Sequence, residues 1–235
     1  MSILSAAQRG AAERLAGDLV RVFGPRLRLV AAYESAHAPA AEAGVVHTLA
    51  LVDAMALQDL SALLTVVAAW HKAKLATPLL LSREEFERSL DVFPIEYQSI
   101  LASHEVLHGA WPEPSVSVGS ADLRRGCERQ VKGHLIHLRE SYLETHGRPS
   151  AVADLIRASA PALRSSLQNV ARLHGVAAAA DDELAAFAGS ALSVDAAAVV
   201  DVLRFAREGQ AADATALLPR YLSCVEQLWR AVDRG

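Results

Sequence analysis

The sequence of 235 residues contains one pattern with the residue types and spacing of a metal site, His104-Glu105-Val106-Leu107-His108. On a helix, two histidines four residues apart lie on the same side and can share a zinc ion, while the glutamate between them activates a bound water. Glu128 follows in the same part of the chain and is a candidate for the third ligand. Zinc-dependent hydrolysis is therefore one function that the sequence allows.

The residues after this pattern favour a different conformation. Gly109 and the pair Trp111-Pro112 follow the second histidine almost directly, so a helix would end where a zinc-binding helix usually continues. In a strand, residues four apart also share a face, but at about 13 Å they cannot bind one ion. We therefore expect a strand or a turn over residues 105 to 108, and no bound zinc.

A second candidate pair lies in a helical segment farther along the chain. Arg129 and His134 have the spacing that HEPN-type helical ribonucleases use to attack and stabilise a phosphodiester. A histidine beside an apolar helical stripe is more often a hydrogen-bonded packing residue. Arg125, Arg129 and Lys132 also form a basic stripe, which suits an acidic partner or a phosphate but equally a solvated helix face.

Composition limits the classes of partner. The net charge of -4 and the pI near 6.1 argue against nucleic acid as a partner, because phosphate neutralisation requires an excess of Lys and Arg. The longest uncharged apolar stretch, Leu60 to Trp70, falls far short of the roughly 20 residues of a membrane helix, so we expect no membrane partner. The N-terminus lacks the pattern of a signal peptide, and the two cysteines suit a reducing compartment, so we expect a cytoplasmic protein.

Hydrophobic periodicity predicts a mixed α/β segment followed by helices alone. Apolar residues at helical spacing predict helices over 5–23 and 57–74, and Ser82 with Glu85 forms a capping box that begins a short helix ending near residue 90. Alternation and β-branched runs predict four strands, over 26–33, 45–52, 78–81 and 91–97. Pro94 makes the last of these an edge strand or a bulged strand.

The segment 109–119 concentrates Pro, Gly and Ser where strand patterns disappear. We therefore predict an α/β domain over residues 1–110, a linker over 111–119 and a helical bundle domain over 120–235. Helices are expected from Ser120 to the Gly147-Arg148-Pro149 stop and then over about 150–174, 182–190, 195–208 and 212–233, with Pro161 kinking or dividing the second. The fold class is thus α+β, with a helical bundle after a mixed sheet.

Three sequence segments resemble a known family: SLDVFPIEY at 89–97, VLHG at 106–109 and CERQVKGHLIHLRESYL at 127–143. They are similar to bacterial proteins in which a nucleotidyltransferase-like domain precedes a helical domain. The resemblance covers about residues 15 to 175. It implies a nucleotidyltransferase-like sheet in the first domain.

The resemblance also implies where an active site would lie. Active members cradle a triphosphate with a Gly-Ser turn, which falls here at Glu34-Ser35, and hold divalent metals with an Asp-x-Asp pair, which falls at about His47 and Leu49. A third carboxylate on a later strand would correspond to Glu96, or to Asp91. Because leucine offers no oxygen to magnesium and Glu34 repels phosphates, the catalytic positions are degenerate.

The interpretation that follows is a degenerate nucleotidyltransferase-fold protein that binds a nucleotide-like ligand or a protein partner, with no cofactor. The candidate ligand-binding residues are Glu34, Ser35, His47, Glu96, Arg129 and Lys132. Three alternatives stay open: residual nucleotidyl transfer with magnesium at Ser35 and Glu96, zinc hydrolysis at His104 and His108, and a purely helical interaction module. The apolar stripe from Leu217 to Trp229 favours core packing over a homodimer interface.

Overall fold

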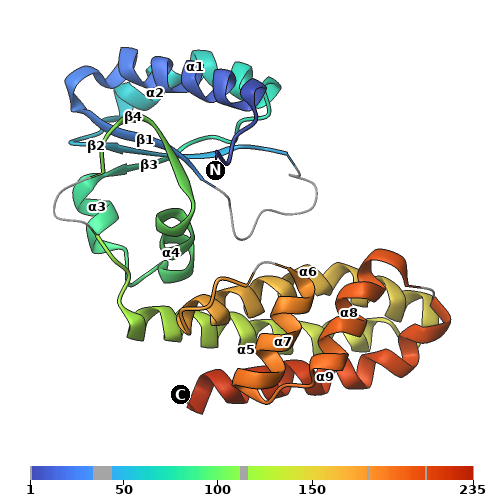
Figure 1. Cartoon of the computed structure of the whole chain (residues 1–235). Helices are drawn as coiled ribbons and strands as arrows, with labels where there is room; N and C mark the ends of the chain where they lie inside the picture. Colours follow the sequence, from blue (N-terminus) through green and yellow to red (C-terminus); the bar gives the residue numbers. More distant parts are fainter. Residues whose placement is uncertain (1, 34–43, 112–115, 179, 210, 235) are drawn as a thin grey trace. The chain divides into compact units, whose positions relative to one another are not determined.

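The computed structural model describes residues 2–33, 44–111, 116–178, 180–209 and 211–234 (Figure 1). The chain forms two compact units, Met1–Gly119 and Ser120–Gly235. The first unit contains all the strands that the structure describes, and the second is built from helices. The α+β class expected from the sequence is therefore confirmed.

A small mixed sheet forms the centre of the first unit. Its strands are β1 (Leu27–Tyr33), β2 (His47–Val52), β3 (Leu79–Ser82) and β4 (His104–Gly109), in the spatial order β3-β2-β1-β4. β1 pairs antiparallel with β2 and with β4, whereas β3 runs parallel to β2. The parallel pair requires a crossover, and helix α2 (Leu57–Lys72) provides it.

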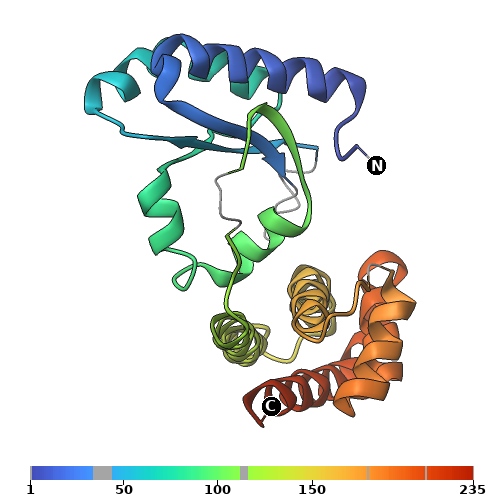
Figure 2. The same ribbon diagram turned by 60° about the vertical axis from the view of Figure 1, so that its left-hand side comes forward.

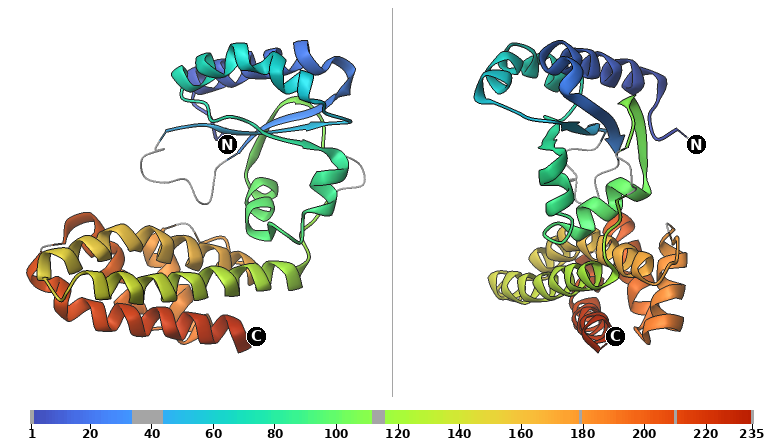
Figure 3. Two further views of the ribbon diagram at one scale, coloured as in Figure 1. Left: turned by 180° about the vertical axis from the view of Figure 1, so that it is seen from behind. Right: turned by 90° about the vertical axis from the view of Figure 1, so that its left-hand side faces the viewer.

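The two faces of this sheet pack against different helices, as Figures 2 and 3 show. Alternate strand residues such as Val30, Ala50 and Val52 pack with α1 (Ala6–Phe23) and α2. The opposite set packs with α3 (Arg83–Arg88) and α4 (Pro94–Ala102). That second core contains Leu29, Ala31, Leu49, Leu51, Phe86, Tyr97 and Ile100.

The local signals for the first unit mostly act as expected. The expected capping box of Ser82 with Glu85 begins α3. Ser5 forms a further capping box with Gln8 at the start of α1, which was not predicted from the sequence. Asp59, in the first turn of α2, accepts two hydrogen bonds from Arg26, at 2.7 and 2.8 Å, and one from the backbone of Ala56. These contacts tie the start of α2 to the segment before β1 and lower the pKa of Asp59 to about 2.

The strand expected over residues 91–97 is wrong, because a helix begins there instead. Residues 89–93 form a turn, and α4 starts at Pro94. Proline is favourable at the first helical position, where its missing N–H has no intrahelical partner to lose. Tyr97 and Ile100, three residues apart, then point into the core beside Phe86. Their spacing fits the period of a helix, whereas the short alternation before Pro94 wrongly indicated a strand.

The second unit contains five helices among its described residues, which confirms the expected bundle of four or five. They are α5 (Ser120–Glu144), α6 (Pro149–Leu173), α7 (Asp181–Leu192), α8 (Ala196–Glu208) and α9 (Ala211–Arg234). Helix α6 packs against α5, α8 and α9, and α7 lies beside α8 (Figures 1 and 2). Pro161 lies inside α6 and does not divide it, which corrects that part of the expectation.

The apolar stripe of α9 belongs to the core of this unit. Leu217, Leu218, Tyr221, Val225 and Leu228 are all buried within it. Their burial supports core packing, because a homodimer interface would need these side chains at the surface. Of the helices that the structure describes, none has the combination of length and hydrophobicity needed to span a bilayer.

Candidate functional site

The structure places two of the positions implied by the nucleotidyltransferase resemblance, His47 and Leu49, on strand β2. Glu34 and Ser35 lie outside the described residues. His47 begins β2 opposite Tyr33, with their ring centroids 5.9 Å apart. Leu49 is two residues farther along the same face, fully buried in the core beneath α3 and α4.

Glu96 does not lie on a strand, so its assignment as the third strand carboxylate is wrong. It is exposed in the first turn of α4, and its neighbour Tyr97 is the residue that points into the core. Asp91, the other candidate, is exposed in the turn before that helix. Asp53 follows β2 and forms an ion pair of 2.5 Å with Arg28, which lowers the pKa of that carboxyl group.

The face that would carry paired metal ligands is occupied by apolar side chains. Leu49 packs among Leu29, Leu51, Phe86 and Tyr97. Magnesium takes oxygen ligands and keeps several waters in its shell, so this surrounding fits no magnesium ion. Residues 47 and 49 therefore cannot act as an Asp-x-Asp pair.

The HEVLH segment forms strand β4, which is one of the two conformations, strand or turn, expected for it. The Nδ1 atom of His104 hydrogen-bonds to the carbonyl oxygen of Ile100 at 3.0 Å, and Nε2 lies 2.6 Å from the indole Nε1 of Trp111. Because the carbonyl can only accept and the indole can only donate, His104 carries its proton on Nδ1 and uses the Nε2 lone pair for Trp111. Neither nitrogen is free for a metal.

The other residues of the proposed zinc site also lie in separate surroundings. Glu105 forms an ion pair with Arg9 of α1, and His108 pairs with Val30 across the sheet. Glu128 is on α5, in the second unit. Within the part of the chain that the structure describes, no three His, Cys, Asp or Glu side chains are grouped in a way that would hold a metal ion.

Arg129 and His134 do not form a common site on α5. Five residues on a helix correspond to a turn of about 140° beyond one full rotation, so the two side chains leave the axis in different directions. Arg129 is exposed, whereas His134 points inward and its Nε2 lies 2.9 Å from the hydroxyl of Tyr221. Burial and the nearby His137 lower the pKa of His134 to about 4, so it is neutral at pH 7.

The basic stripe of α5 is largely engaged within its own unit. Arg125 forms an ion pair with Asp122, and the ammonium of Lys132 lies 3.4 Å from the centre of the Trp229 ring. Such a cation over an aromatic face is a favourable contact that needs no ligand. Only Arg129 of these three has a side chain that extends into solvent without a described partner.

The structure instead reveals a cavity between α8 and α9 that the sequence did not indicate. Its volume is about 640 Å³, within the usual range for small-molecule or side-chain pockets. Phe205 and Leu217 form an apolar wall, and most of the other lining residues are charged. The lining residues are Asp201, Arg204, Phe205, Glu208, Gly209, Asp213, Ala216, Leu217 and Arg220.

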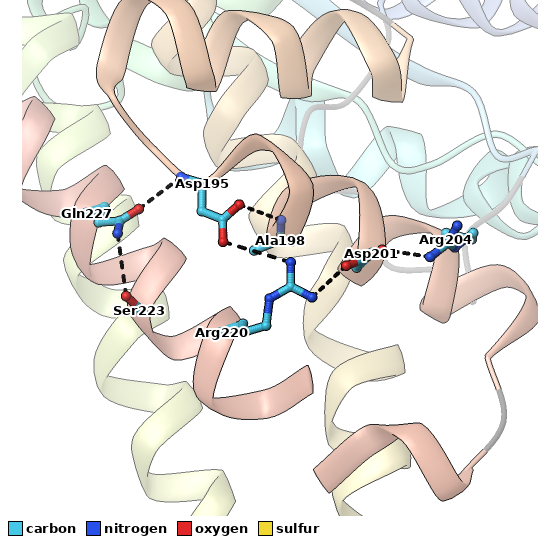
Figure 4. Close-up of polar contacts among 7 residues, drawn as sticks. All are labelled: Asp195, Ala198, Asp201, Arg204, Arg220, Ser223 and Gln227. Atoms are coloured by element: carbon cyan, nitrogen blue, oxygen red, sulfur yellow. Dashed lines mark hydrogen bonds and ion pairs between the residues drawn. The ribbon is translucent and has the colours of Figure 1, made fainter. Parts of the chain in front are cut away.

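Arg220 is fixed at one side of this cavity by carboxylates of α8. Its guanidinium lies 2.6 Å from Asp201 and 3.8 Å from Asp195, the N-cap of α8 (Figure 4). Asp201 also accepts from Arg204 at 2.6 Å. Two guanidinium groups therefore share Asp201, and both are oriented by partners on the same helix.

The remaining acids of the lining have no such partner. Neither Glu208 nor Asp213 takes part in an ion pair or side-chain hydrogen bond among the described residues. The cavity thus offers two free carboxylates beside an apolar wall, while its arginines are already neutralised. This combination suits a positively charged group attached to an apolar body.

Sequence reasoning missed this site because its parts come together only in the packed bundle. Asp201 and Arg220 are 19 residues apart and lie on different helices. The one local signal was Asp195, which caps α8 through a hydrogen bond to the backbone of Ala198. It marks the start of the helix and gives no indication of a cavity.

Comparison with known proteins adds no relative from which a role could be transferred. No family model matches the chain, and no curated protein matches it. Function is therefore inferred from the chemistry of the described residues.

Proposed function

We propose that this protein acts by binding a partner and does not transfer nucleotides. In this proposal the first unit has a nucleotidyltransferase-like frame whose catalytic face has become a packed core. The observation that carries the proposal is the complete burial of Leu49 beneath α3 and α4. A core of leucine and aromatic side chains at that position leaves no room for hydrated metal ions and a triphosphate.

The cavity between α8 and α9 is the site that best supports binding. It combines sufficient volume, an apolar wall and fixed charged groups, which together are typical of recognition sites. The arginines Arg204 and Arg220 are engaged by Asp201 and Asp195. A phosphate would have to displace these carboxylates, whereas a cation meets Glu208 and Asp213 directly.

Of the two ligand classes considered, a nucleotide or a protein partner, the charge of the cavity therefore favours a protein partner. That partner would present a lysine or arginine next to an apolar residue. The cationic end would lie by Glu208 and Asp213, and the apolar residue against Phe205 and Leu217. A purely helical interaction module without such a pocket would show no preference for basic peptides.

We expect the purified full chain to incorporate no labelled nucleotide into protein, RNA or small-molecule acceptors with magnesium or manganese. The reason is that metal ions supply most of the charge stabilisation in nucleotidyl transfer, and His47 and Leu49 cannot hold them. Labelled ATP, GTP, CTP and UTP are tested separately. Transfer by the wild-type chain that is lost in Glu96→Ala would contradict the proposal and restore the enzyme alternative.

We also expect a fluorescein-labelled oligo-arginine peptide ending in leucine to bind the full chain more tightly than an oligo-glutamate peptide of the same length or ATP. Glu208→Gln and Asp213→Asn should each weaken its binding about fivefold, as expected for loss of one partly exposed ion pair. Fluorescence anisotropy at low salt measures both effects. Glu140→Gln, an exposed acid on α5, is the matched control and should change nothing.

Equal weakening by all three substitutions would indicate general charge attraction and would remove the cavity from the proposal. Preferential binding of ATP, lost in Arg220→Gln, would favour the nucleotide ligand instead.

A further inference from the structure

The outer side of α2 carries an apolar stripe that nothing described in the first unit covers. Leu57, Leu60 and Leu64 expose 78%, 38% and 73% of their surface. Their spacing of three and four residues places them on one side of the helix. A helix face in contact with water normally carries charged residues, yet the segment from Leu60 to Trp70 has none.

This stripe lies on the side of α2 that faces away from α1. Ala69, Trp70 and Ala73 line the groove between the two helices. At 100° per residue, Leu60 and Leu64 leave the helix on nearly the opposite side. Because α1 packs on β1 and β4, the free side of α2 lies toward the other edge of the sheet (Figure 3).

That other edge is β3, and it is also open. β3 pairs with β2 on one side, and no other backbone partner of residues 79–82 exists among the described residues. Its sequence, Leu79-Leu80-Leu81-Ser82, has none of the charges or internal prolines that usually protect an edge strand. Leu79 exposes 36% of its surface and extends the apolar patch onto the strand.

We propose that α2 and β3 form a symmetric interface with a second copy of this chain. A two-fold axis passing between Leu60 and Ser61 would run the two α2 helices antiparallel. Leu57 of each copy then contacts Leu64 of the other, which is the reciprocal pattern of an isologous interface. The same axis sets the two β3 edges antiparallel, so that each supplies hydrogen-bonding groups to the other.

The area of the patch and its charge both fit this occupant. The four leucines together expose the equivalent of about two whole leucine residues on each copy, comparable to the patches of a few hundred Å² that mark interaction sites. The two copies of this patch together with a pair of β3 strands would bury a total surface of roughly 1,200 Å², which is the lower end of the range for specific interfaces. The stripe carries no charged residue that would select a partner of different sequence. In an antiparallel pair, the basic last turns of the two α2 helices, which contain His71 and Lys72, lie at opposite ends of the pair.

The test is sedimentation velocity of the full chain over a range of roughly 1 to 200 µM, which brackets the micromolar affinity of a small interface. We expect a reversible monomer–dimer equilibrium that Leu57→Glu and Leu64→Glu each weaken at least about tenfold. Leu143→Glu is the matched control, because Leu143 is a similarly exposed leucine on α5. Circular dichroism verifies that each variant is folded.

A disulfide experiment tests the geometry independently of those substitutions. The native cysteines, Cys127 and Cys224, are buried, and burial raises the pKa of each thiol to about 12, so neither competes. Ser61→Cys should form a covalent dimer under mild oxidation, and Ser190→Cys on α7 should not. A chain that stays monomeric at every concentration, a dimer that Leu57→Glu and Leu64→Glu leave intact, or Ser61→Cys that fails to cross-link would each overturn the proposal.

Discussion

Replacing Leu49 by aspartate is expected to destabilise the first unit by several kcal/mol rather than to restore a metal site. Leu49 is fully buried on β2, an interior strand, among Leu29, Leu51 and Phe86. An unpaired carboxylate in such a core costs about 3–5 kcal/mol, and the lost apolar packing adds to that cost. Total stabilities of domains are of the same order, about 5–15 kcal/mol.

Urea denaturation followed by circular dichroism measures the loss, and hydrogen exchange identifies the unit in which it occurs. We expect amides of β1 and β2 to lose protection while those of α5 and α6 keep it. Val106→Asp is the matched control, because Val106 lies on β4 of the same sheet and is exposed. The Val106→Asp substitution should lower the free energy of unfolding by no more than about 1 kcal/mol.

A Leu49→Asp chain as stable as Val106→Asp, with magnesium-dependent stabilisation, would contradict this expectation. It would mean that the face beneath α3 and α4 admits water and metal. The binding proposal would then lose its main support.

Lowering the pH from 7.5 to 4 is expected to destabilise the second unit through His134. The pKa of His134 is lowered in the folded protein to about 4, from 6.5, so the unfolded chain binds the proton more tightly. The contribution of neutral His134 to the free energy of unfolding is fully present above pH 6.5 and is lost progressively as the pH falls toward 4. At 1.36 kcal/mol per pKa unit the loss is at most about 3 kcal/mol, and residual contact with water reduces it.

The physical cause is the position of the imidazole beside Tyr221. Burial raises the pKa of the Tyr221 hydroxyl and lowers that of the imidazole, so both groups are neutral in their hydrogen bond of 2.9 Å. Protonation places a charge in an apolar part of the bundle with no carboxylate as its described hydrogen-bond partner. His137, three residues farther along α5, adds electrostatic repulsion.

His134→Gln should therefore be less stable than wild type at pH 7.5 and should lose less stability between pH 6.5 and 4. Urea denaturation at several pH values gives both quantities. His146→Asn is the control, because His146 is exposed and its φ of 51° is tolerated by asparagine. An unchanged pH dependence in His134→Gln would assign the acid sensitivity to other groups.

The sequence alone determined most of the local structure. Helical spacing of apolar residues predicted α1 near its observed ends. The capping box of Ser82 with Glu85 predicted the start of α3, since Ser82 satisfies a free N–H group of the first turn. The β-branched apolar run before Asp53 predicted β2. Gly109 and Trp111 after His108 excluded a helix for HEVLH and left a strand or a turn, of which the structure has the strand.

Tertiary packing decided what these local signals left ambiguous. The segment around Pro94 alternates like a strand over a few residues, but Tyr97 and Ile100 reach the core beside Phe86 only from a helix. Such a short segment carries too few residues to separate the two periods, so burial of its apolar side chains makes the choice.

The candidate sites also divide into those that the sequence predicts and those that only tertiary packing forms. The residue types at 47 and 49 were enough to predict that no paired carboxylates are present, because ligand chemistry is a property of the side chain itself. The cavity of Asp201 and Arg220 and the open side of α2 depend on which helices lie next to each other. Those contacts join residues distant in the chain, and only the tertiary structure brings them together.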